Sequence, residues 1–238
     1  MADKDLPLIS VIVPAWNEEK YLKTLLPRLI AQDYSNYEII VIDNNSKDNT
    51  AQVASSFGVK VISEKKQGTS YARAKGFEKA RGEIIVRTDA DTLPEKGWIR
   101  SYYEEFQKYP EAVAISGSSE FYDGGLVLKF ISRLFFLWII YITRVFMGHY
   151  PLNGPNFAVR KKVVEKISPH TNDSIIHEDM DLSCHLRVYG EVKFDPNLVV
   201  KTSSRRLFQD PLFIFRYTLK SIITYFLHHP SHHLHKVK

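Results

Sequence analysis

Short apolar runs alternate with segments of helical spacing along the first half of the chain. The runs are rich in Val and Ile and cover residues 9–13, 38–42, 59–63 and 83–87. Uninterrupted runs of this length are typical of strands in a parallel sheet that is covered on both faces. The segments with helical spacing are residues 21–32, 50–57 and 70–80. With a further strand over 112–116, this alternation predicts an α/β fold with a mostly parallel, Rossmann-like sheet flanked by helices.

Polar loops follow three of the predicted strands. They read PAWNEE at 14–19, DNNSKDNT at 43–50 and TDADT at 88–92. Ligands of such sheets bind at the carboxyl ends of the strands. We therefore expect the three loops to meet at one edge of the sheet and to form the binding site.

An apolar segment, LVLKFISRLFFLWIIYITRVFM, occupies residues 126–147. Its longest part without a charge, residues 134–143, is short of the roughly 20 apolar residues that span a bilayer, which argues against a single transmembrane helix. On a helix Lys129, Arg133 and Arg144 lie on one side, which fits a helix in a membrane interface with its cations toward lipid phosphates. A buried helix of the core or of a dimer is the alternative, and the pattern does not separate the two.

A second amphipathic helix is predicted over residues 211–227. Its apolar side consists of Leu212, Phe215, Leu219, Ile222, Ile223 and Phe226. Another side carries Arg216, Lys220 and Thr224. Five histidines follow, at positions 228, 229, 232, 233 and 235. They could bind a metal, although a solvated basic terminus is the simpler interpretation.

Composition and charge narrow the class of protein. Of 238 residues, 44% are apolar and 25% charged, as in soluble globular domains, which excludes disordered and collagen-like chains. The single cysteine, Cys184, excludes a disulfide-stapled scaffold and favours a reducing compartment. The net charge of +5 favours anionic partners such as nucleotides or acidic membrane surfaces. The first eight residues lack the apolar core of a signal peptide, so we expect a cytoplasmic protein.

Asp89 and Asp91 are the strongest chemical signal. Two carboxylates one residue apart at the end of a strand can bind a hard divalent cation, which then neutralises a diphosphate. An isolated Asp-x-Asp triplet also arises from chance and turn chemistry. Here the triplet follows a buried strand, and Asp43 ends an earlier strand of the same sheet.

Six motifs together resemble the family-2 nucleotide-sugar glycosyltransferases, which have the GT-A fold. The resemblance covers roughly residues 8–206. The motifs are ISVIVPAWNEEKYL, VIDNNSKDNT, QGTSYARAKG, TDADT, GPNFAVRK and HEDMDLSCHLRVYG, in the family's order. The resemblance implies a GT-A domain over 1–206, including the apolar helix, followed at 207–238 by an amphipathic helix and a His-rich tail.

The resemblance also implies the nucleotide site and its metal. The nucleotide-binding residues it implies are Pro14, Ala15, Asn17, Glu18, Asp43, Asn45, Gly68, Arg73, Asp89, Ala90 and Asp91. The metal, Mn²⁺ or Mg²⁺, is bound chiefly by Asp91 together with Asp89. The family's loop usually begins with two aspartates, whereas Asn44 follows Asp43 here, which removes one charge. Arg73 is also interpretable as an ordinary cation on a helix surface.

Glu178 and Asp179 match the family's acceptor-side Glu-Asp motif. The match makes Asp179 the candidate general base of an inverting, single-displacement transfer, in which the attacking hydroxyl loses its proton. These two carboxylates and Asp181 could equally begin a helix, where they interact well with its dipole. Both interpretations can hold together.

The acceptor side is predicted from two further segments. Gly154, Pro155 and Asn156 resemble the family's loop beneath the acceptor, although a plain turn explains the same residues. Arg205 and Arg206 could bind a diphosphate or a lipid phosphate, and two exposed arginines are the alternative. Processive polysaccharide synthases carry a Gln-x-x-Arg-Trp motif and several long transmembrane helices. Neither feature is found in this sequence, which favours addition of one sugar per encounter.

These observations predict a metal-dependent, inverting hexosyltransferase that is peripheral on the inner face of the cell membrane. It would move one sugar from a nucleotide diphosphate, UDP before GDP, to a lipid or lipid-linked acceptor, and an oligomer is compatible with the sequence. One alternative is a polyprenyl-phosphate sugar synthase, whose acceptor is a phosphate. Another is a catalytically silent nucleotide-binding scaffold. Nucleic-acid binding is disfavoured because the predicted site loops are acidic.

Overall fold

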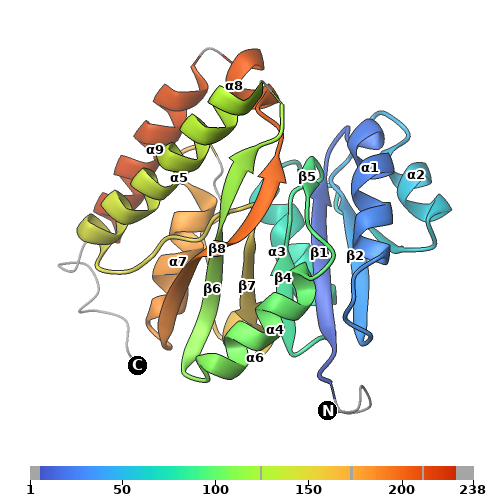
Figure 1. The fold of residues 1–238 in the computed structure, drawn as a ribbon, viewed down its shortest axis with the longest axis horizontal. Helices are drawn as coiled ribbons and strands as arrows, with labels where there is room; N and C mark the ends of the chain where they lie inside the picture. The colour runs from blue at the N-terminus through green and yellow to red at the C-terminus, as the bar shows by residue number, and fades with distance from the viewer. Residues whose placement is uncertain (1–5, 124, 172–173, 211, 229–238) are drawn as a thin grey trace.

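The structure is a computed structural model that describes residues 6–123, 125–171, 174–210 and 212–228. Its centre is an eight-stranded sheet in the order β3-β2-β1-β4-β7-β6-β8-β5 (Figure 1). The strands are β1 (Ile9–Ala15), β2 (Tyr37–Asp43), β3 (Lys60–Ser63), β4 (Ile84–Arg87), β5 (Thr92–Leu93), β6 (Ala112–Phe121), β7 (Phe157–Arg160) and β8 (Glu191–Thr202). β1 to β4 pair in parallel, as do β6 and β8. β7 and β5 pair antiparallel with their neighbours.

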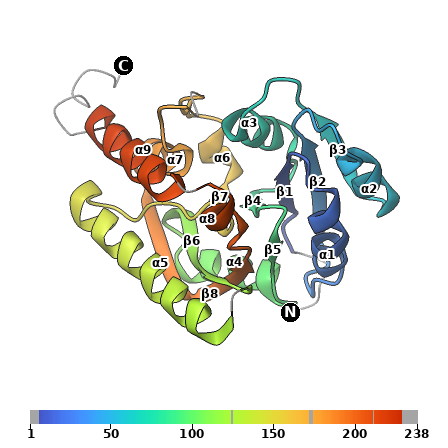
Figure 2. The ribbon, with the colours of Figure 1, turned by 90° about the horizontal axis from the view of Figure 1, so that it is seen from above.

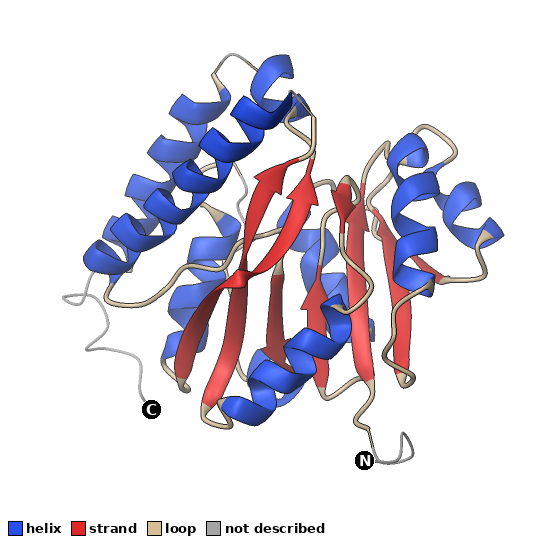
Figure 3. Cartoon of the chain, viewed as in Figure 1, coloured by secondary structure: helices blue, strands red, loops and turns tan. Residues whose placement is uncertain are grey.

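Helices cover both faces of the sheet (Figure 3). They are α1 (Glu19–Ile30), α2 (Thr50–Ser56), α3 (Thr69–Lys79), α4 (Trp98–Lys108), α5 (Gly125–Met147), α6 (Lys161–Val164), α7 (Glu178–Arg187), α8 (Arg205–Gln209) and α9 (Phe213–Leu227). Seen from above, α7 lies beside α9, and the two helices are in contact (Figure 2). The predicted mostly parallel α/β sheet is confirmed, with β7 and β5 as its antiparallel members.

Alternate residues of the buried strands fill two separate cores. Val11 and Val13 of β1 pack in the core that includes the leucines of α1 and part of α4. Ile12, between them, packs in the core that includes Phe77 of α3 and Leu182 of α7. Successive strand residues point to opposite faces. The uninterrupted apolar runs therefore serve both layers, as the pattern predicted.

The predicted strands and helices are present, but the pattern did not indicate α4, β7 or β8. β6 also continues well beyond its predicted end, to Phe121. In β8 the residues Asp195, Pro196 and Asn197 lie where the register of the strand against β6 shifts. A bulge of this kind breaks the two-residue alternation that marks a strand in a sequence.

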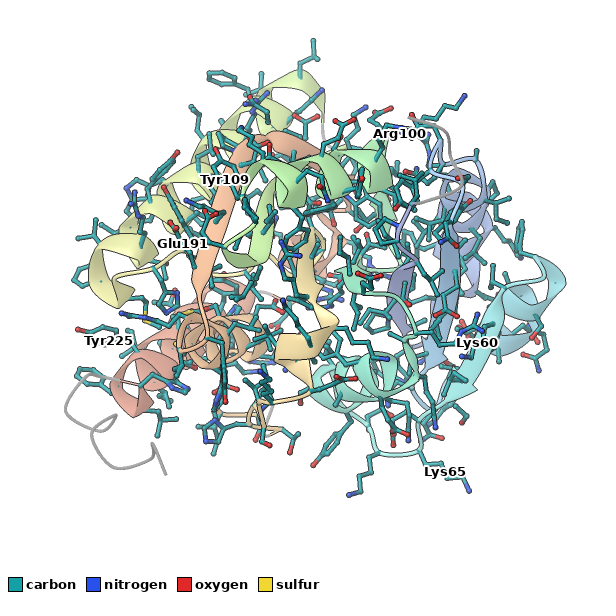
Figure 4. The ribbon with its side chains drawn as sticks, turned by 90° about the horizontal axis from the view of Figure 1, so that it is seen from below. Lys60, Lys65, Arg100, Tyr109, Glu191 and Tyr225 are labelled. Carbon is teal, nitrogen blue, oxygen red and sulfur yellow. The ribbon has the colours of Figure 1, made fainter. Side chains whose placement is uncertain are left out.

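α5 and α9 lie along one flank of the molecule (Figure 1) and expose most of their apolar side chains. In α5 only Ser132 and Ile140 are buried, so α5 is not a core helix of this chain. It is also long and apolar enough to cross a membrane by length and composition, which its charge-free part did not indicate. Phe146 of α5 contacts the ring of Tyr225 of α9, which lies at the edge of the molecule in Figure 4.

The predicted cationic side of α5 needs correction. Lys129 forms an ion pair with Glu120 of β6 at 3.0 Å. Arg144 lies over the ring of Tyr150 and donates a hydrogen bond to its hydroxyl at 2.9 Å. Two of the three cations thus contact the protein itself, because β6 and the segment after α5 supply their partners. Arg133 is exposed.

Candidate active site

The loops after β1 and β2 are joined by hydrogen bonds. The Asn17 N–H donates to Ser46 Oγ at 3.0 Å, and Asn17 Oδ1 accepts from the Lys47 N–H at 2.8 Å. The Glu18 N–H donates to Thr50 Oγ1, also at 2.8 Å. Two of the three loops that were predicted to meet at the carboxyl edge of the sheet are therefore joined directly.

Backbone conformation explains two of the asparagines in these loops. Asn17 and Asn45 have φ values of +54° and +61°, in the left-handed region. Asparagine tolerates this region better than most residues other than glycine. Both side chains are exposed at the edge of the sheet where Asp43 ends β2.

Asn44 connects the loop before α3, residues 64–68, to this edge of the sheet by hydrogen bonds. Its buried Nδ2 donates to the carbonyls of Glu64 and Lys66 at 3.1 and 2.6 Å, and its Oδ1 accepts from the Gly68 N–H at 2.8 Å. An aspartate has no hydrogen to donate when ionised. The departure from the family's second aspartate thus supplies donors that the loop before α3 requires. Gly68, whose N–H donates to Asn44, has a φ of +144°, a backbone conformation that favours glycine.

Asp91 and Glu18 share an arginine. Asp91 is 4% exposed, and its Oδ2 accepts from Arg205 Nε at 2.8 Å, while Arg205 Nη2 donates to Glu18 Oε1. Burial and the charge of Asp89 raise the pKa of Asp91, against the opposing effect of Arg206 and Arg205. Burial also raises the pKa of Glu18. The buried Glu18 Oε2 has no hydrogen-bond partner among the described residues.

A pocket of about 340 Å³ opens next to Asp91. Its lining includes Tyr21, Ala90, Asp91, Tyr122, Asp123 and Ser203. The volume lies at the lower end of the range for small-molecule sites. Two predicted nucleotide-binding residues, Ala90 and Asp91, therefore face one pocket.

Arg87, the last residue of β4, contacts three carboxylates. It is 2% exposed, and its Nη1 donates to Asp179 Oδ1 at 2.6 Å. Its Nη2 donates to Asp89 Oδ1 at 3.0 Å and to Glu178 Oε1 at 3.2 Å. Arg73 of α3 donates to Glu178 Oε2 at 2.9 Å. Arg87 thus brings the carboxylates after β4 next to those that begin α7.

The start of α7 positions Glu178 and Asp179. His177 precedes the helix, and its ring accepts a hydrogen bond from the Met180 N–H at 3.5 Å. Carboxylates in a first helical turn interact favourably with the helix dipole. Burial raises the pKa of Asp179 well above its ordinary value, although Arg87 opposes this effect. The predicted helix start is confirmed, and a base at this position stays a prediction.

Gly154 lies against Asp179. A Cβ at this position would be 2.5 Å from Asp179 Oδ2 and 3.1 Å from Arg87 Nη1, so a side chain here would displace the carboxylate. The absence of a side chain at Gly154 thus leaves room for the Asp179 carboxylate, and contact of this glycine with an acceptor stays a prediction. Pro155, the next residue, is partly buried.

The structure corrects the prediction that Asn156 contacts an acceptor. Asn156 is fully buried, and its Nδ2 donates to the carbonyls of Ser118 and Leu198. Its Oδ1 accepts from Trp98 Nε1 and from the Tyr102 hydroxyl, each at 2.8 Å. The whole amide is used to join α4, β6 and β8. The sequence could not show this because all four partners are distant in the chain.

Two further predictions change. Arg205, predicted on the acceptor side, lies with Asp91 and Glu18. Arg206 is exposed, and phosphate binding by it stays a prediction. Arg73, predicted at the nucleotide or on a helix surface, is buried against Glu178.

The first loop needs a smaller correction. The side chain of Ala15 is buried in the core, so Ala15 offers only its backbone to the site, and its carbonyl accepts from the Asn44 N–H. Pro14 is partly buried.

Sequence reasoning missed Arg87 and the structural roles of Asn44 and Thr50. A signal for Arg87 was present, because it ends an otherwise apolar strand immediately before TDADT. A buried arginine requires carboxylate partners. That requirement could have identified Arg87 as part of the site, but not which carboxylates it contacts.

Comparisons with known proteins agree with this architecture. Among solved structures, glucosyl-3-phosphoglycerate synthase from Mycobacterium tuberculosis, crystallised with Mn²⁺, UDP and glucosyl-3-phosphoglycerate, has a TM-score of 0.70 at 19% identity. The match covers 95% of this chain and 81% of that chain. A mannosyltransferase from Pyrobaculum calidifontis in complex with GDP-Man and Mn²⁺ has a TM-score of 0.69 at 16% identity, over 95% of this chain and 75% of that one. At these identities the likeness shows the fold.

Curated relatives match by sequence. A probable glycosyltransferase, YdaM of Bacillus subtilis, is 29% identical over 212 residues, which are 81% of this chain and 50% of the relative. A dolichol-phosphate mannosyltransferase of Pyrococcus furiosus is 33% identical over 172 residues, 67% of this chain and 48% of the relative. The chain thus spans about half the length of these relatives. The profile of glycosyl transferase family 2 matches residues 10–168. The chain belongs to glycosyl transferase family 2.

Proposed function

We propose that this chain transfers one sugar from a nucleotide diphosphate, UDP before GDP, to a lipid or lipid-linked acceptor, with inversion at the sugar. The observation that carries the proposal is the junction at Arg87. It brings Asp89 next to Glu178 and Asp179, which lie some 90 residues further along the chain. Groups for the donor and for the acceptor hydroxyl must be separate yet adjacent in such a transfer.

Asp89, Asp91 and Glu18 offer carboxylate oxygens to a divalent cation. Oxygen ligands suit Mg²⁺ and Mn²⁺. The buried Glu18 Oε2 has no hydrogen-bond partner among the described residues, and burial disfavours the ionised form of Asp91 by raising its pKa. A bound cation would stabilise both carboxylates in their ionised form. We propose that Asp91 and Asp89 hold the metal, which supplies positive charge to the leaving diphosphate. The Mn²⁺ in the solved glycosyltransferases named above supports this assignment.

The remaining groups at the carboxyl edge fit a nucleotide. Asn17, Asp43 and Asn45 expose polar atoms where the first two loops meet, and we assign them to base and ribose. Arg205 lies between Glu18 and Asp91 and offsets part of their negative charge. We propose that its guanidinium also interacts with the diphosphate, and its contact with Asp91, which lines the pocket, supports this role.

Asp179 is the proposed general base. Burial favours its neutral form and so raises its proton affinity, which a base that takes a proton from a hydroxyl needs. Arg87 holds one of its oxygens, Oδ1, and Gly154 leaves room beside the other, Oδ2. Arg87 and Arg73 act as positioning residues, because each contacts the carboxylates of α7.

We further propose that α5 and the segment 207–238 contact the cytoplasmic face of the membrane, while residues 1–206 form the catalytic domain. The support is the outward direction of the apolar sides of α5 and α9 on one flank. Large exposed apolar patches mark interaction surfaces. The dolichol-phosphate mannosyltransferase of Pyrococcus furiosus supports a lipid-linked acceptor.

The proposal is tested by release of nucleoside diphosphate from UDP-sugars and GDP-sugars, with Mn²⁺ and a lipid extract as acceptor source. Asp91→Asn should reduce turnover at least 100-fold, because one metal ligand loses its charge. Glu104→Gln, at an exposed position on α4, is the matched control and should retain full turnover. Equal turnover of Asp91→Asn and the wild type would refute the metal assignment. Tight binding of sugar nucleotides without transfer would instead indicate the silent scaffold.

One observation favours the alternative of a phosphate acceptor. Asp179 Oδ1 is bound at 2.6 Å by Arg87, which lowers its availability as a base. A phosphate is already ionised and requires no base. Asp179→Asn should then keep at least a tenth of the wild-type turnover with polyprenyl phosphate. A loss of 1000-fold or more would favour a hydroxyl acceptor.

A further inference from the structure

We infer that His170, Asp181, His185 and His228 form a second metal site, of the zinc class, that joins the end of α9 to α7. One ligand atom from each residue lies within 4.8 Å of all the others. His170 comes from the segment before α7, Asp181 and His185 from α7, and His228 follows α9. The site is separate from the carboxylates at the end of β4.

The distances suit four-coordinate binding. Asp181 Oδ1 lies 2.7 Å from His170 Nδ1, 2.7 Å from His228 Nε2 and 3.7 Å from His185 Nε2. In a tetrahedral zinc site with bonds of about 2.0 to 2.1 Å, neighbouring ligand atoms are about 3.3 Å apart. The observed separations lie on both sides of this value. The remaining separations are within 4.8 Å, so side-chain rotations would bring the four atoms around one ion.

Local structure holds the ligands in place. Asp181 and His185 are four residues apart on α7 and so share one face of the helix. The Asp181 side chain is fully buried, and its second oxygen, Oδ2, accepts from the His170 backbone N–H at 2.8 Å. Such outer hydrogen bonds orient the carboxylates and imidazoles of metal sites.

His185 provides an independent observation. Its Nε2 is buried, points toward Asp181 at 3.7 Å and has no hydrogen-bond partner within the described ranges. A buried ring nitrogen without a partner is costly. A bound cation would use its lone pair and would satisfy the Asp181 carboxylate at the same time.

The ligands of this second site favour a different metal ion from the one proposed at Asp89 and Asp91. Three imidazoles and one carboxylate suit Zn²⁺ or Co²⁺, whereas Mg²⁺ and Mn²⁺ prefer oxygen ligands. Asp179 and Asp181 are two residues apart on a helix and do not face each other. Asp179 turns toward Arg87, and Asp181 toward the histidines. All four ligands also lie beyond residues 10–168, the region of the family match.

The proposed ion couples the apolar flank to the candidate active site. α9 already contacts the start of α7 one turn earlier, where the His177 N–H donates to Thr224 Oγ1 at 2.8 Å. His228 and Asp181 repeat this contact four residues further along each helix. A metal here would fix α9 relative to the helix that carries Glu178 and Asp179. Its role would be structural and positional.

The test uses the full chain, stripped with a chelator and titrated with Zn²⁺ against a chromophoric chelator. We expect one tight equivalent of Zn²⁺, a higher melting temperature with Zn²⁺ than without it, and strong visible absorption of four-coordinate Co²⁺. His185→Gln should weaken Zn²⁺ binding at least 100-fold. His170→Gln, at a half-exposed side chain, is a second variant should His185→Gln fail to fold. Circular dichroism checks folding.

Two controls separate the site from its neighbours. The quadruple replacement His229→Gln, His232→Gln, His233→Gln and His235→Gln, all outside the described residues, should keep the tight equivalent. Asp89→Asn with Asp91→Asn should keep it too, even if sugar transfer is lost. The inference is overturned if His185→Gln and His170→Gln bind Zn²⁺ like the wild type, if the quadruple variant loses the tight equivalent, or if the wild type binds none.

Discussion

The role of each residue in this candidate site follows from the side chains that it contacts. Arg87 is fully enclosed, and its guanidinium contacts Asp89, Glu178 and Asp179. Buried charges persist only when they are paired and hydrogen-bonded. The carboxylates of two motifs therefore stay together because Arg87 contacts all three and Arg73 adds a second positive charge at Glu178, and loss of Arg87 would leave like charges close together.

The substitution Gly154→Ala tests whether turnover depends on the position of the Asp179 carboxylate. The added methyl group would be 2.5 Å from Asp179 Oδ2 and would displace the carboxylate. We expect kcat/KM to fall at least tenfold and the free energy of unfolding to fall by about 1–3 kcal/mol. Steady-state kinetics and urea denaturation provide the two measurements.

Gly97→Ala is the matched control for this substitution. At Gly97 the nearest atom to an added Cβ, Asp33 Oδ2, is 3.9 Å away, so neither quantity should change appreciably. Unchanged kinetics for Gly154→Ala would show that the position of Asp179 does not govern turnover.

For single residues, the sequence indicated which residues belong to the candidate site better than it indicated which groups they contact. Asp89, Asp91, Glu178 and Asp179 were predicted for the site, and the structure brings them to one edge of the sheet. Asn156 was assigned to an acceptor but is buried between α4, β6 and β8. A residue type limits which hydrogen bonds are available, while the fold decides which partners are near.

The ends of strands and the start of a helix bring the residues of the candidate site together. β1, β2 and β4 are parallel and end at one edge, so the loops that follow them share it. α7 begins at the same site, which puts Glu178 and Asp179 in its first turn. The parallel strands were readable from their apolar runs, whereas the place of α7 depends on long-range packing against β6 and β8.

Three elements meet at Glu38 of β2, and this junction predicts a pH dependence of stability. Burial favours a higher pKa, but hydrogen bonds from Ser10 of β1 and from Arg81 before β4 outweigh it and hold the pKa of Glu38 below its ordinary value of 4.5. The folded state therefore binds fewer protons than the unfolded state around this pH. The stabilisation is present above pH 4.5 and is lost as the pH falls through the folded pKa.

Glu38→Gln should lower the free energy of unfolding by about 1–3 kcal/mol at pH 7, because donors of Ser10 and Arg81 lose a charged acceptor. The difference from the wild type should shrink below pH 4.5, where the wild-type carboxyl takes up its proton. Urea unfolding at several pH values measures both. Glu104→Gln, at an exposed position, should match the wild type throughout. A difference for Glu38→Gln that stays constant with pH would contradict the argument.

The whole molecule is asymmetric in polarity. The carboxyl edge carries the acidic groups of the site, while α5 and α9 expose apolar side chains along one flank. On α9 the apolar side faces outward and Thr224 faces α7, the reverse of a core helix. This orientation predicts binding to lipid vesicles through the flank.

Phe215→Ser combined with Phe226→Ser should reduce flotation with vesicles of anionic and zwitterionic lipid at least tenfold. Both rings are about two-thirds exposed, and each buried aromatic side chain contributes about 1.5–3 kcal/mol. Added salt should weaken binding little, because Lys129 and Arg144 already have partners in the protein.

Ile30→Ser on α1, also an exposed apolar position, is the control and should float like the wild type. Wild-type protein that stays out of the lipid fraction, and that sediments as a dimer dispersed by the double substitution, would assign the flank to a second copy of the chain.

The sequence by itself determined the parallel α/β sheet, the loops at its carboxyl edge and the acidic residues of the candidate site, because these follow from local apolar patterning and short motifs. Tertiary structure alone decided that Arg87 joins those acidic residues, that Asn156 is enclosed and that the apolar side of α9 faces outward. It also decided that His228 lies against Asp181. Each of these facts is a contact between residues far apart in the chain, and local patterning carries no information about which distant groups will meet.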